Sequence, residues 1–407
     1  MTPPSRFEPT GDQFERLLAD YRYLHAHPEL SLHEFETAAW LERRLEALGF
    51  TTQRIAETGV AAVLTNGDGP VVAFRADTDG LPVSEDTGVE WASRTVWEDA
   101  DGNRTPVMHA CGHDIHMTCA IAAAEWLASH KDEWSGTLEL ILQPAEEIVQ
   151  GARNMLNAGL WDAIPHAEAV YGQHVWPIPA GQVWVNPGPF FAAVDTYRIE
   201  VFGRGGHGSM PETTIDPVVL TAAITLRLQT IVSREVGLHE RAVLTVGSIH
   251  AGSKENVIPS SGELLVSTRT YSPDVQRRMA EAIARIARAE AAASGAPEPN
   301  IVPMYNASCV VNDADETATL LGLLGDELGE DAVLVPENPM TASEDFGYLG
   351  AAIGAPSVFW VFGGYRGMHP GDAVPTNHSP HFLPDPDSSI RTGTSAALTA
   401  LMSRLGR

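Results

Sequence analysis

The sequence predicts an α/β fold with a mainly parallel sheet, into which a smaller βαββαβ domain of the ferredoxin-like type is inserted. Strands alternate with helices in both terminal parts of the chain, which is typical of a parallel sheet. The apolar run Val71–Arg75 is typical of a strand that is buried on both faces. Between residues 188 and 304 the order changes to βαββαβ. We therefore expect a first domain made of residues 1–187 and 305–407, and an inserted domain made of residues 188–304.

The N-terminal part of the chain predicts two amphipathic helices. Apolar residues at helical spacing follow Asp12, and Pro28 ends this helix. Ser31 and Glu34 fit a capping box at the start of the second helix, which Gly49 ends. The segment His25–Glu29 between the helices holds either ligands or only an ordinary polar loop. The sequence leaves both interpretations open.

Potential ligands follow one another at the ends of predicted strands and at a helix start. The predicted elements are strands at Val60–Leu64, Val71–Arg75, Thr137–Leu142 and Ala167–Gly172, and a helix that follows the turn of Cys111 and His113 and ends at about Ser129. The side chains after the strands or at the helix start are Asp77, Cys111, His113, Glu146, Glu147 and His174. Because ligands bind outside the carboxyl ends of strands in open α/β sheets, we expect these residues to converge on one site.

The segment His109–His116 is interpreted as half of a metal site. Cys111 and His113 stand on either side of a glycine, and a thiolate and an imidazole are suitable ligands for Zn²⁺ or Mn²⁺. Any one of these residues alone is more often an ordinary buried residue than a ligand, whereas the cluster favours metal binding. Asp77 ends a buried strand, where a carboxylate is costly unless it binds something or accepts hydrogen bonds.

The remaining elements complete the two domains. In the insertion we expect strands at Val194–Phe202, Ala242–Ile249, Gly262–Thr270 and Asn300–Met304, and helices at Asp216–Ser233 and Pro273–Ser294. After it come a helix at Asp313–Leu328, a buried strand at Pro356–Phe362 and a final helix at Ser388–Leu405. The loop before that helix carries His369, His378 and His381, one of which is placed to complete the site. The pattern of residues does not say which one.

Composition limits the partners. The 407 residues include 26 basic and 53 acidic side chains, and a net charge of −27 disfavours nucleic acid and anionic membranes. Three cysteines are too few for a disulfide framework and favour a reducing compartment. The first residues have no apolar signal core, and no run of eighteen apolar residues occurs. We expect a cytoplasmic protein.

Seven short motifs stand in the order of a known family. They are Ala76-Asp-Thr-Asp, His109-Ala-Cys-Gly-His-Asp, Pro144-Ala-Glu-Glu, His174-Val-Trp-Pro, Gly205-Gly-His-Gly, Asn256-Val-Ile-Pro and Ser343-Glu-Asp-Phe. Together they cover nearly the whole chain. The sequence resembles the M20 metallopeptidase superfamily, in its amidohydrolase branch of aminoacylases, hippurate hydrolases and indole-3-acetyl-amino-acid hydrolases.

The resemblance implies a centre of two divalent metal ions, Zn or Mn, with Co or Ni as alternatives. The positions that match the family's ligands are Cys111, His113, Glu147, His174 and His378. His378 is selected because the stretch from His378 to Phe382 matches the family's His-x-Pro-x-Phe pattern.

The resemblance also implies roles for residues that do not hold metal. Glu146 matches the general base, and His207 matches a histidine that reaches across a dimer to the substrate carbonyl. Asn256 matches a residue near the substrate. We expect Asp77 and Asp114 to support the metal ligands without holding the metals themselves.

The resemblance implies hydrolysis of an N-acyl amino acid to a carboxylic acid and a free amino acid, by a homodimer or larger homo-oligomer formed through the inserted domain. A dipeptidase or carboxypeptidase of the same superfamily is the close alternative. A non-catalytic protein that binds metal or amino acid is a third interpretation, and Glu146 argues against it. A structural zinc site is disfavoured because the ligands come from five distant segments.

Overall fold

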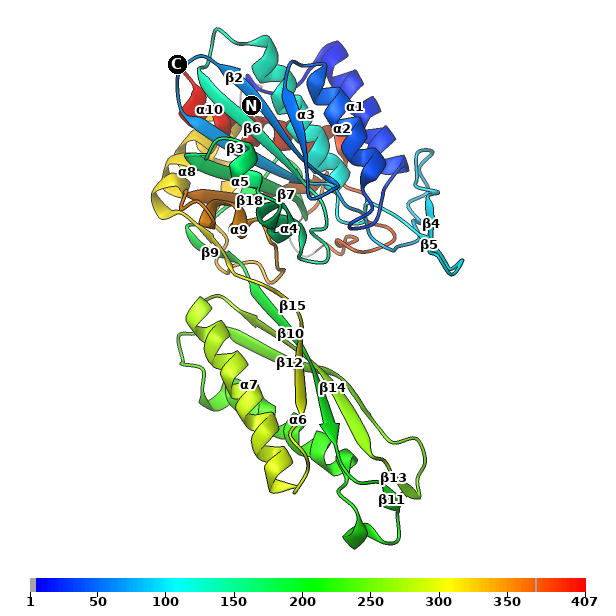
Figure 1. Ribbon diagram of the computed structural model, residues 1–407. Helices are drawn as coiled ribbons and strands as arrows, with labels where there is room; N and C mark the ends of the chain where they lie inside the picture. The colour runs from blue at the N-terminus through cyan, green and yellow to red at the C-terminus, as the bar shows by residue number, and fades with distance from the viewer. Residues whose placement is uncertain (1–4, 370–371) are drawn as a thin grey trace. The chain divides into compact units, whose positions relative to one another are not determined.

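The computed structural model describes residues 5–369 and 372–407, which form two compact units (Figure 1). Unit 1 contains the described residues of Met1–Phe190, Val311–Asn338 and Asp345–Arg407. Unit 2 contains Phe191–Val310 and Pro339–Glu344. The sequence placed residues 305–310 and 339–344 in the first domain and residues 188–190 in the inserted one, whereas contacts group the former with unit 2 and the latter with unit 1. Within the described ranges, no helix has the length and apolarity needed to cross a membrane.

Unit 1 is built on a sheet of eight strands among the described residues, in the order β1-β2-β6-β3-β7-β18-β8-β17. The strands are β1 (Thr51–Ile55), β2 (Gly59–Asn66), β3 (Val71–Asp77), β6 (Gly136–Gln143), β7 (Ala169–Pro179), β8 (Val183–Trp184), β17 (Val333–Leu334) and β18 (Ser357–Tyr365). The central strands β6, β3, β7 and β18 run parallel, and antiparallel pairs occur toward both edges. The expected mainly parallel sheet is confirmed.

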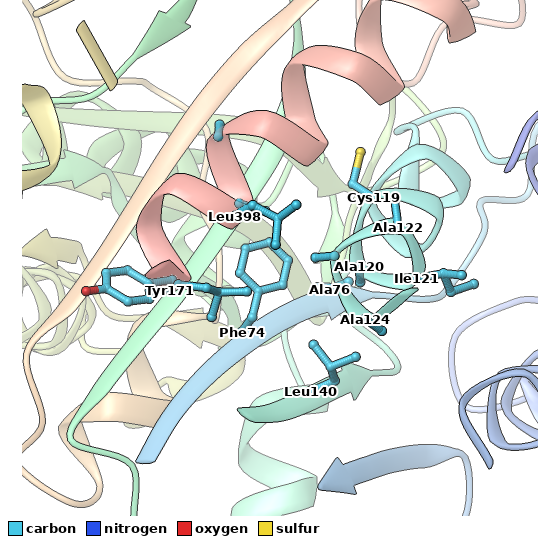
Figure 2. Packing of buried hydrophobic residues seen from close by; sticks show 14 of the residues in the cluster. Phe74, Ala76, Cys119, Ala120, Ile121, Ala122, Ala124, Leu140, Tyr171 and Leu398 are labelled. Carbon is cyan, nitrogen blue, oxygen red and sulfur yellow. The ribbon is translucent and has the colours of Figure 1, made fainter. Parts of the chain in front are cut away.

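Helices cover both faces of this sheet (Figure 1). One face packs against α1 (Gly11–Ala26), α2 (Phe35–Glu46), α3 (His113–Ser129), α8 (Ala314–Leu328) and α10 (Pro386–Leu405). The other face carries α4 (Gly151–Asn157), α5 (Leu160–Ala163) and α9 (Gly347–Ala351). Figure 2 shows the first layer, where Phe74 and Leu140 from the strands lie near Ala120 of α3 and Leu398 of α10. Burial of these apolar side chains is the main stabilising contribution, at roughly 25 cal/mol per Å².

Unit 2 has the strand order of a ferredoxin-like fold, which confirms the predicted βαββαβ pattern. Its sheet runs β12-β14-β10-β15 and is antiparallel throughout. The strands are β10 (Ala193–Phe202), β12 (Ala242–Ala251), β14 (Ser261–Thr270) and β15 (Asn300–Ala307), and the helices are α6 (Pro217–Arg234) and α7 (Pro273–Ala293). Both helices pack on one face of the sheet around a core that includes Leu228, Leu264 and Ile283.

Short elements complete the fold. The sequence did not predict β1 or the hairpin of β4 (Val96–Glu98) and β5 (Arg104–Pro106). Other short elements are β9 (Gly188–Phe191), β11 (Gly206–His207), β13 (Val257–Ile258), β16 (Val310–Asn312), and the 3₁₀ turns Pro211–Thr213 and Glu330–Ala332. In unit 2, β11 pairs with β13.

The predicted capping box of α2 is wrong. The helix begins at Phe35, and the backbone amides of its first turn are capped by Glu29, whose carboxylate accepts hydrogen bonds from the amides of Glu36 and Thr37. Ser31 and Glu34 have the right spacing for a box, but their side chains bind partners elsewhere in the chain. The spacing of Ser31 and Glu34 matches a capping box, but contacts with residues far away in the sequence determine where their side chains lie.

Candidate metal centre and active site

A glycine with a left-handed backbone separates Cys111 and His113, the two predicted ligands of the central motif. Gly112 has a φ of +83° and immediately precedes α3. A Cβ atom at this position would lie 2.4 Å from Cγ1 of Val175, so a side chain is excluded by space as well as by conformation. Cys111 and His113 therefore leave the turn on either side of a residue that has to be glycine. Both side chains are buried.

His113 is oriented by a carboxylate. Its Nδ1 lies 3.2 Å from Oδ1 of Asp79, and Nε2 has no hydrogen-bond partner among the residues that the structure describes. This Nε2 lies 3.8 Å from Oε1 of Glu147 and 3.7 Å from Oδ2 of Asp77. A histidine that gives one ring nitrogen to a carboxylate and keeps the other free is the arrangement typical of metal ligands.

Cys111 joins two further histidines from distant parts of unit 1. Its Sγ lies 3.4 Å from Nε2 of His174 and 3.4 Å from Nε2 of His378. His174 donates through Nδ1 to the carbonyl of Val175 at 2.7 Å, which leaves Nε2 as the nitrogen that faces the thiol. His378 is 56% exposed, and its Nε2 is 3.3 Å from Oε2 of Glu147.

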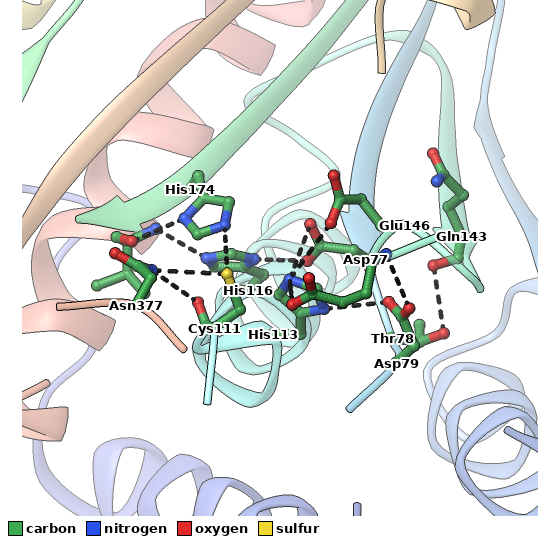
Figure 3. A network of polar contacts seen from close by, with 12 residues as sticks. Asp77, Thr78, Asp79, Cys111, His113, His116, Gln143, Glu146, His174 and Asn377 are labelled. Carbon is green, nitrogen blue, oxygen red and sulfur yellow. Dashed lines mark hydrogen bonds and ion pairs between the residues drawn. The ribbon is translucent and has the colours of Figure 1, made fainter. Parts of the chain in front are cut away.

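The adjacent glutamates follow β6, as the sequence predicted. The Glu147 side chain faces both His113 and His378, at 3.8 and 3.3 Å. The carboxylate of Glu146 lies 4.0 Å from Nε2 of His113 and is also buried. In Figure 3 the side chains of Glu146, Asp77, His113, Cys111 and His174 gather in one place.

His116 belongs to this cluster, although the sequence analysis gave it no role. Its Nδ1 is 2.5 Å from Oδ1 of Asp77, and its Nε2 accepts a hydrogen bond from the amide of Val175 at 2.7 Å. Because both ring nitrogens are engaged, His116 orients Asp77 and is not itself available to a metal. Its position one helical turn after His113 is the signal that could have identified it.

A buried network behind Asp77 was also missed. Arg75 is fully buried and donates to Asp77 at 2.8 Å and to the side-chain oxygen of Gln143 at 2.9 Å. Gln143 in turn donates to Asp345 at 2.6 Å. The strand pattern around Arg75 predicted burial correctly, but its partner Asp345 lies 270 residues away and gives no local signal.

Burial and neighbouring charges shift the pKa values of the clustered residues in different directions. Burial raises the pKa of the Cys111 thiol well above its usual range, and the nearby Glu147 and Glu146 raise it further. Burial likewise raises the pKa of Glu147 to about 8. Burial alone lowers the pKa of His113, but the charges of Asp77 and Asp79 outweigh it and raise that pKa to about 10. Burial, helped by His116, holds the pKa of His174 well below its usual range.

These residues fit a divalent metal centre. Potential ligand atoms of Cys111, His113 and Glu147 all lie within 4.8 Å of one another. Oε1 of Glu147, like Nε2 of His113, is buried and has no hydrogen-bond partner in the described part of the chain. Buried polar atoms in folded proteins normally have hydrogen-bond partners. Two potential metal-binding atoms that lack such partners and lie 3.8 Å apart therefore indicate a place for a cation. The donor set of thiol, imidazole and carboxylate suits Zn²⁺ and its first-row neighbours.

The other histidines of the C-terminal loop lie apart from the cluster. His381 contacts the carbonyl of Asp86 at 2.7 Å, and the backbone amide of His369 donates to Asp372. The backbone amide of His378 donates to the carbonyl of Ala110 at 2.8 Å, which brings this histidine beside Cys111. The geometry thus selects the histidine that the resemblance selected.

Asp114 contacts a histidine outside the predicted ligand set. It lies 2.7 Å from Nδ1 of His25, whose other nitrogen is 3.0 Å from Glu85. Burial lowers the pKa of His25, but hydrogen bonds to the two carboxylates outweigh it and raise the pKa to about 9. The segment His25–Glu29, which the sequence left open, therefore contributes a buried ion-pair network.

His207 and Asn256 lie together in unit 2. His207 is in β11, and it pairs with Val257, the neighbour of Asn256. The amide of Gly208 donates to the carbonyl of Asn256 at 2.9 Å. Both residues are exposed.

The sequence profile of peptidase family M20/M25/M40 matches residues 73–403. The chain belongs to this family. Among curated proteins it is 37% identical over 316 residues to an N-acetylcysteine deacetylase of Bacillus subtilis, covering 75% of this chain and 80% of that protein. It is 35% identical over 330 residues to the hippurate hydrolase of Campylobacter jejuni, covering 80% of this chain and 82% of that one. These relatives place the chain in the amidohydrolase branch of the family.

A solved structure supports the same assignment. A dinuclear metal binding peptidase of the M20 family from Bacillus subtilis superposes with a TM-score of 0.75 at 30% identity, covering 95% of this chain and 98% of that one. The resemblance drawn from the short motifs is therefore confirmed.

Proposed function

We propose that the protein is a metal-dependent amidohydrolase that cleaves N-acyl amino acids to a carboxylic acid and a free amino acid. The observation that carries this proposal is the convergence of Cys111, His113, Glu147, His174 and His378, with Glu146 at its edge. The family membership and the names of the relatives support the same reaction.

The five converging residues would hold two divalent ions, of which Zn²⁺ and Mn²⁺ suit the donors best, with Co²⁺ or Ni²⁺ as alternatives. When bound, such ions supply Lewis acidity, which lowers the pKa of water and polarises an amide carbonyl. Asp79 orients His113 and the carbonyl of Val175 orients His174, so hydrogen bonds to neighbouring groups fix the direction of both imidazole ligands.

Glu146 acts as the general base. Its carboxylate lies at the edge of the cluster, 4.0 Å from His113, and is buried, which keeps it out of bulk water. It accepts a proton from the attacking water and passes it to the nitrogen of the departing amino acid. The same carboxylate can therefore assist both the attack of water and the departure of the amino acid.

His207 supplies a hydrogen-bond donor. The amide of Ser209 donates to its Nδ1 at 3.2 Å, so the proton is on Nε2, and Nε2 is the nitrogen available to a substrate. A donor of this kind stabilises the negative charge that develops on the carbonyl oxygen. We assign this contact to His207 of a second subunit, with Asn256 beside it.

A homodimer formed through unit 2 is supported by its apolar surface. Leu226 of α6 is 74% exposed and Val219 is 64% exposed. The edge strand β12 carries Val243 and Ile249, which are also exposed. An unpaired edge beside exposed apolar side chains fits a symmetric interface between two copies. The acidic net charge argues against a nucleic acid or an anionic membrane as partner, and the names of the relatives support a small N-acyl amino acid as substrate. Three free cysteines support a cytoplasmic location.

The test is release of free amino acid from N-acetyl, N-benzoyl and long-chain N-acyl amino acids, with free dipeptides in parallel. The protein is stripped with chelator and reloaded separately with Zn²⁺, Mn²⁺ or Co²⁺, and bound metal is counted by mass spectrometry. We expect metal-dependent release from the acylated substrates and two ions per chain. Cleavage of dipeptides alone would identify a peptidase. Bound metal without turnover of any substrate would indicate a binding protein.

A further inference from the structure

The short segment between α1 and α2 contacts the turn that carries Glu146 and Glu147. The hydroxyl of Ser31 donates to Oδ2 of Asp79 at 2.7 Å. Oε1 of Glu34 accepts a hydrogen bond from the backbone amide of Ala145 at 2.8 Å. Both carboxylates are fully or almost fully buried. The residues that the sequence assigned to a helix cap thus reach the site instead.

The turn itself has an unusual backbone. Ala145 has a φ of +52° and Val149 has a φ of +56°. Both values lie in the left-handed region, which residues other than glycine rarely adopt. Within the turn, the amide of Val149 donates to the carbonyl of Glu146 at 2.7 Å. The amide of Gln150 donates to the carbonyl of Ala145 at 3.1 Å. A conformation of this kind persists where surrounding contacts hold it.

Two carboxylates outside the turn hold the amides on either side of Glu146. Glu34 binds the amide of Ala145, and Oδ2 of Asp79 binds the amide of Glu147 at 3.0 Å. The backbone of Glu146 is therefore fixed from both sides. These hydrogen bonds are strong because the groups are buried and water cannot compete for the amides.

Glu34 and Asp79 differ in what else they touch. Asp79 also contacts Nδ1 of His113, so a change there disturbs a metal ligand directly. The Glu34 carboxyl group accepts hydrogen bonds from the backbone amides of Leu32 and Ala145 and also contacts the side chain of Thr58, none of which is a predicted metal ligand. A substitution of Glu34 can therefore alter the position of Glu146 without changing a residue that contacts His113.

We propose that Glu34 is a positioning residue for Glu146. Its carboxylate holds the amide of Ala145 and so sets the direction in which the next side chain, the base, leaves the backbone. The inference rests on the proposed function, in which Glu146 accepts the proton of the attacking water. A displacement of a reacting group by about 1 Å can cost on the order of 10²-fold in rate, so a positioning contact of this kind affects turnover strongly.

The experiment compares Glu34→Ala, Glu34→Asp and Glu34→Gln with the wild-type protein. Gln keeps an oxygen at the same distance and can still accept from Ala145, whereas Asp keeps the charge but shortens the side chain by one methylene. We expect kcat to fall roughly 10- to 100-fold in the Ala and Asp variants, with KM within about twofold and two metal ions still bound. We expect Gln to retain most of the activity and the pH profile of kcat/KM, and the acid limb of that profile to move in Ala and Asp.

Glu139→Gln is the matched control. Glu139 is another fully buried carboxyl group on β6, and both of its oxygens lack a hydrogen-bond partner among residues 5–369 and 372–407. Its replacement removes a buried acid without removing a contact to the turn, and kcat should stay unchanged. If Glu34→Ala fails to fold, the comparison of Asp with Gln decides the question. Wild-type kcat in Glu34→Asp, or a loss in Gln equal to that in Asp, would overturn the proposal.

Amide hydrogen exchange gives a readout that does not depend on activity. We expect peptides covering residues 145–149 to exchange at least about tenfold faster in Glu34→Asp than in the wild type, and Glu34→Gln to match the wild type. Unchanged exchange in Glu34→Asp would count against the positioning contact. An inactive wild-type protein would refute the proposed function and leave this measurement of the contact valid.

Discussion

At the scale of single residues, the two adjacent glutamates have different surroundings and therefore different expected roles. Glu147 faces His113 and His378, whereas Glu146 lies at the edge of the cluster. We expect Glu146→Gln to bind two metal ions and to lose about 10³-fold or more in kcat, because a general base contributes roughly 10²- to 10⁴-fold. Turnover with metal counting checks this, and near-normal kcat would remove the assignment.

Glu139 predicts a pH dependence of stability. Burial raises its pKa from 4.5 to about 8, so the folded state binds the proton more tightly than the unfolded state. Stability contributed by the neutral acid is therefore lost as the pH rises between these values, by about 1.4 kcal/mol per pH unit. Glu139→Gln does not titrate, so its advantage in the free energy of unfolding should grow from pH 5 to pH 8. Parallel urea titrations at both pH values measure it, and a constant difference would contradict the prediction.

Single residues also mark the limit of sequence reasoning. Cys111 and His113 could be recognised because they are neighbours in one motif. Ser31 and Glu34 were misinterpreted because their spacing fits a capping box, whereas their partners Asp79 and Ala145 are 48 and 111 residues away. Contacts over such distances follow from the packing of the sheet and leave no local pattern.

At the scale of elements, the start of α3 has no room for a side chain at Gly112. Gly112→Ala adds a methyl group 2.4 Å from Val175 to a residue with a φ of +83°. We expect the turn to shift, the metal content to fall below two ions per chain and the free energy of unfolding to drop by about 1–3 kcal/mol. Gly102 is a suitable control, since it also has a positive φ but open space around it. If Gly112→Ala keeps both ions while Gly102→Ala behaves identically, the close approach to Val175 is unimportant.

Element types were predicted well because the apolar periodicity was strong. The strands β3 and β6 and the helices α1, α3 and α10 all lie within a few residues of their expected positions. The hairpin β4–β5 was not predicted, because its strands are only three residues long and mostly exposed. For His378, the periodic pattern gave a loop with three histidines, and the choice among them came from the family motif.

At the scale of the whole molecule, the proposed dimer predicts linked losses of association and activity. Leu226→Asp places a charge on the exposed apolar face of α6, and Leu238→Asp places one on a loop residue that is 95% exposed. We expect the first variant to shift toward monomer in light scattering and to lose turnover with it, and the second to remain dimeric and active. Full activity in a monomeric Leu226→Asp would remove the role of His207 in a neighbouring site.

The same interface allows a complementation test. His207→Ala and Glu146→Gln are each expected to be nearly inactive with metal bound. In exchanged heterodimers one site regains both groups, so partial activity should return. A mixture that exchanges subunits, as seen by mass, and stays inactive would show that His207 acts within its own chain or not at all.

The order of strands in unit 1 also has a consequence for biosynthesis. β18 pairs with β7, yet unit 2 is encoded between them, and His378 follows later still. On the ribosome, unit 2 therefore emerges as an almost continuous segment that can fold while the sheet of unit 1 still lacks β18. The proposed ligand set is complete only when nearly the entire chain has been synthesised, so we expect a nascent chain to acquire its full metal centre only when translation is almost finished.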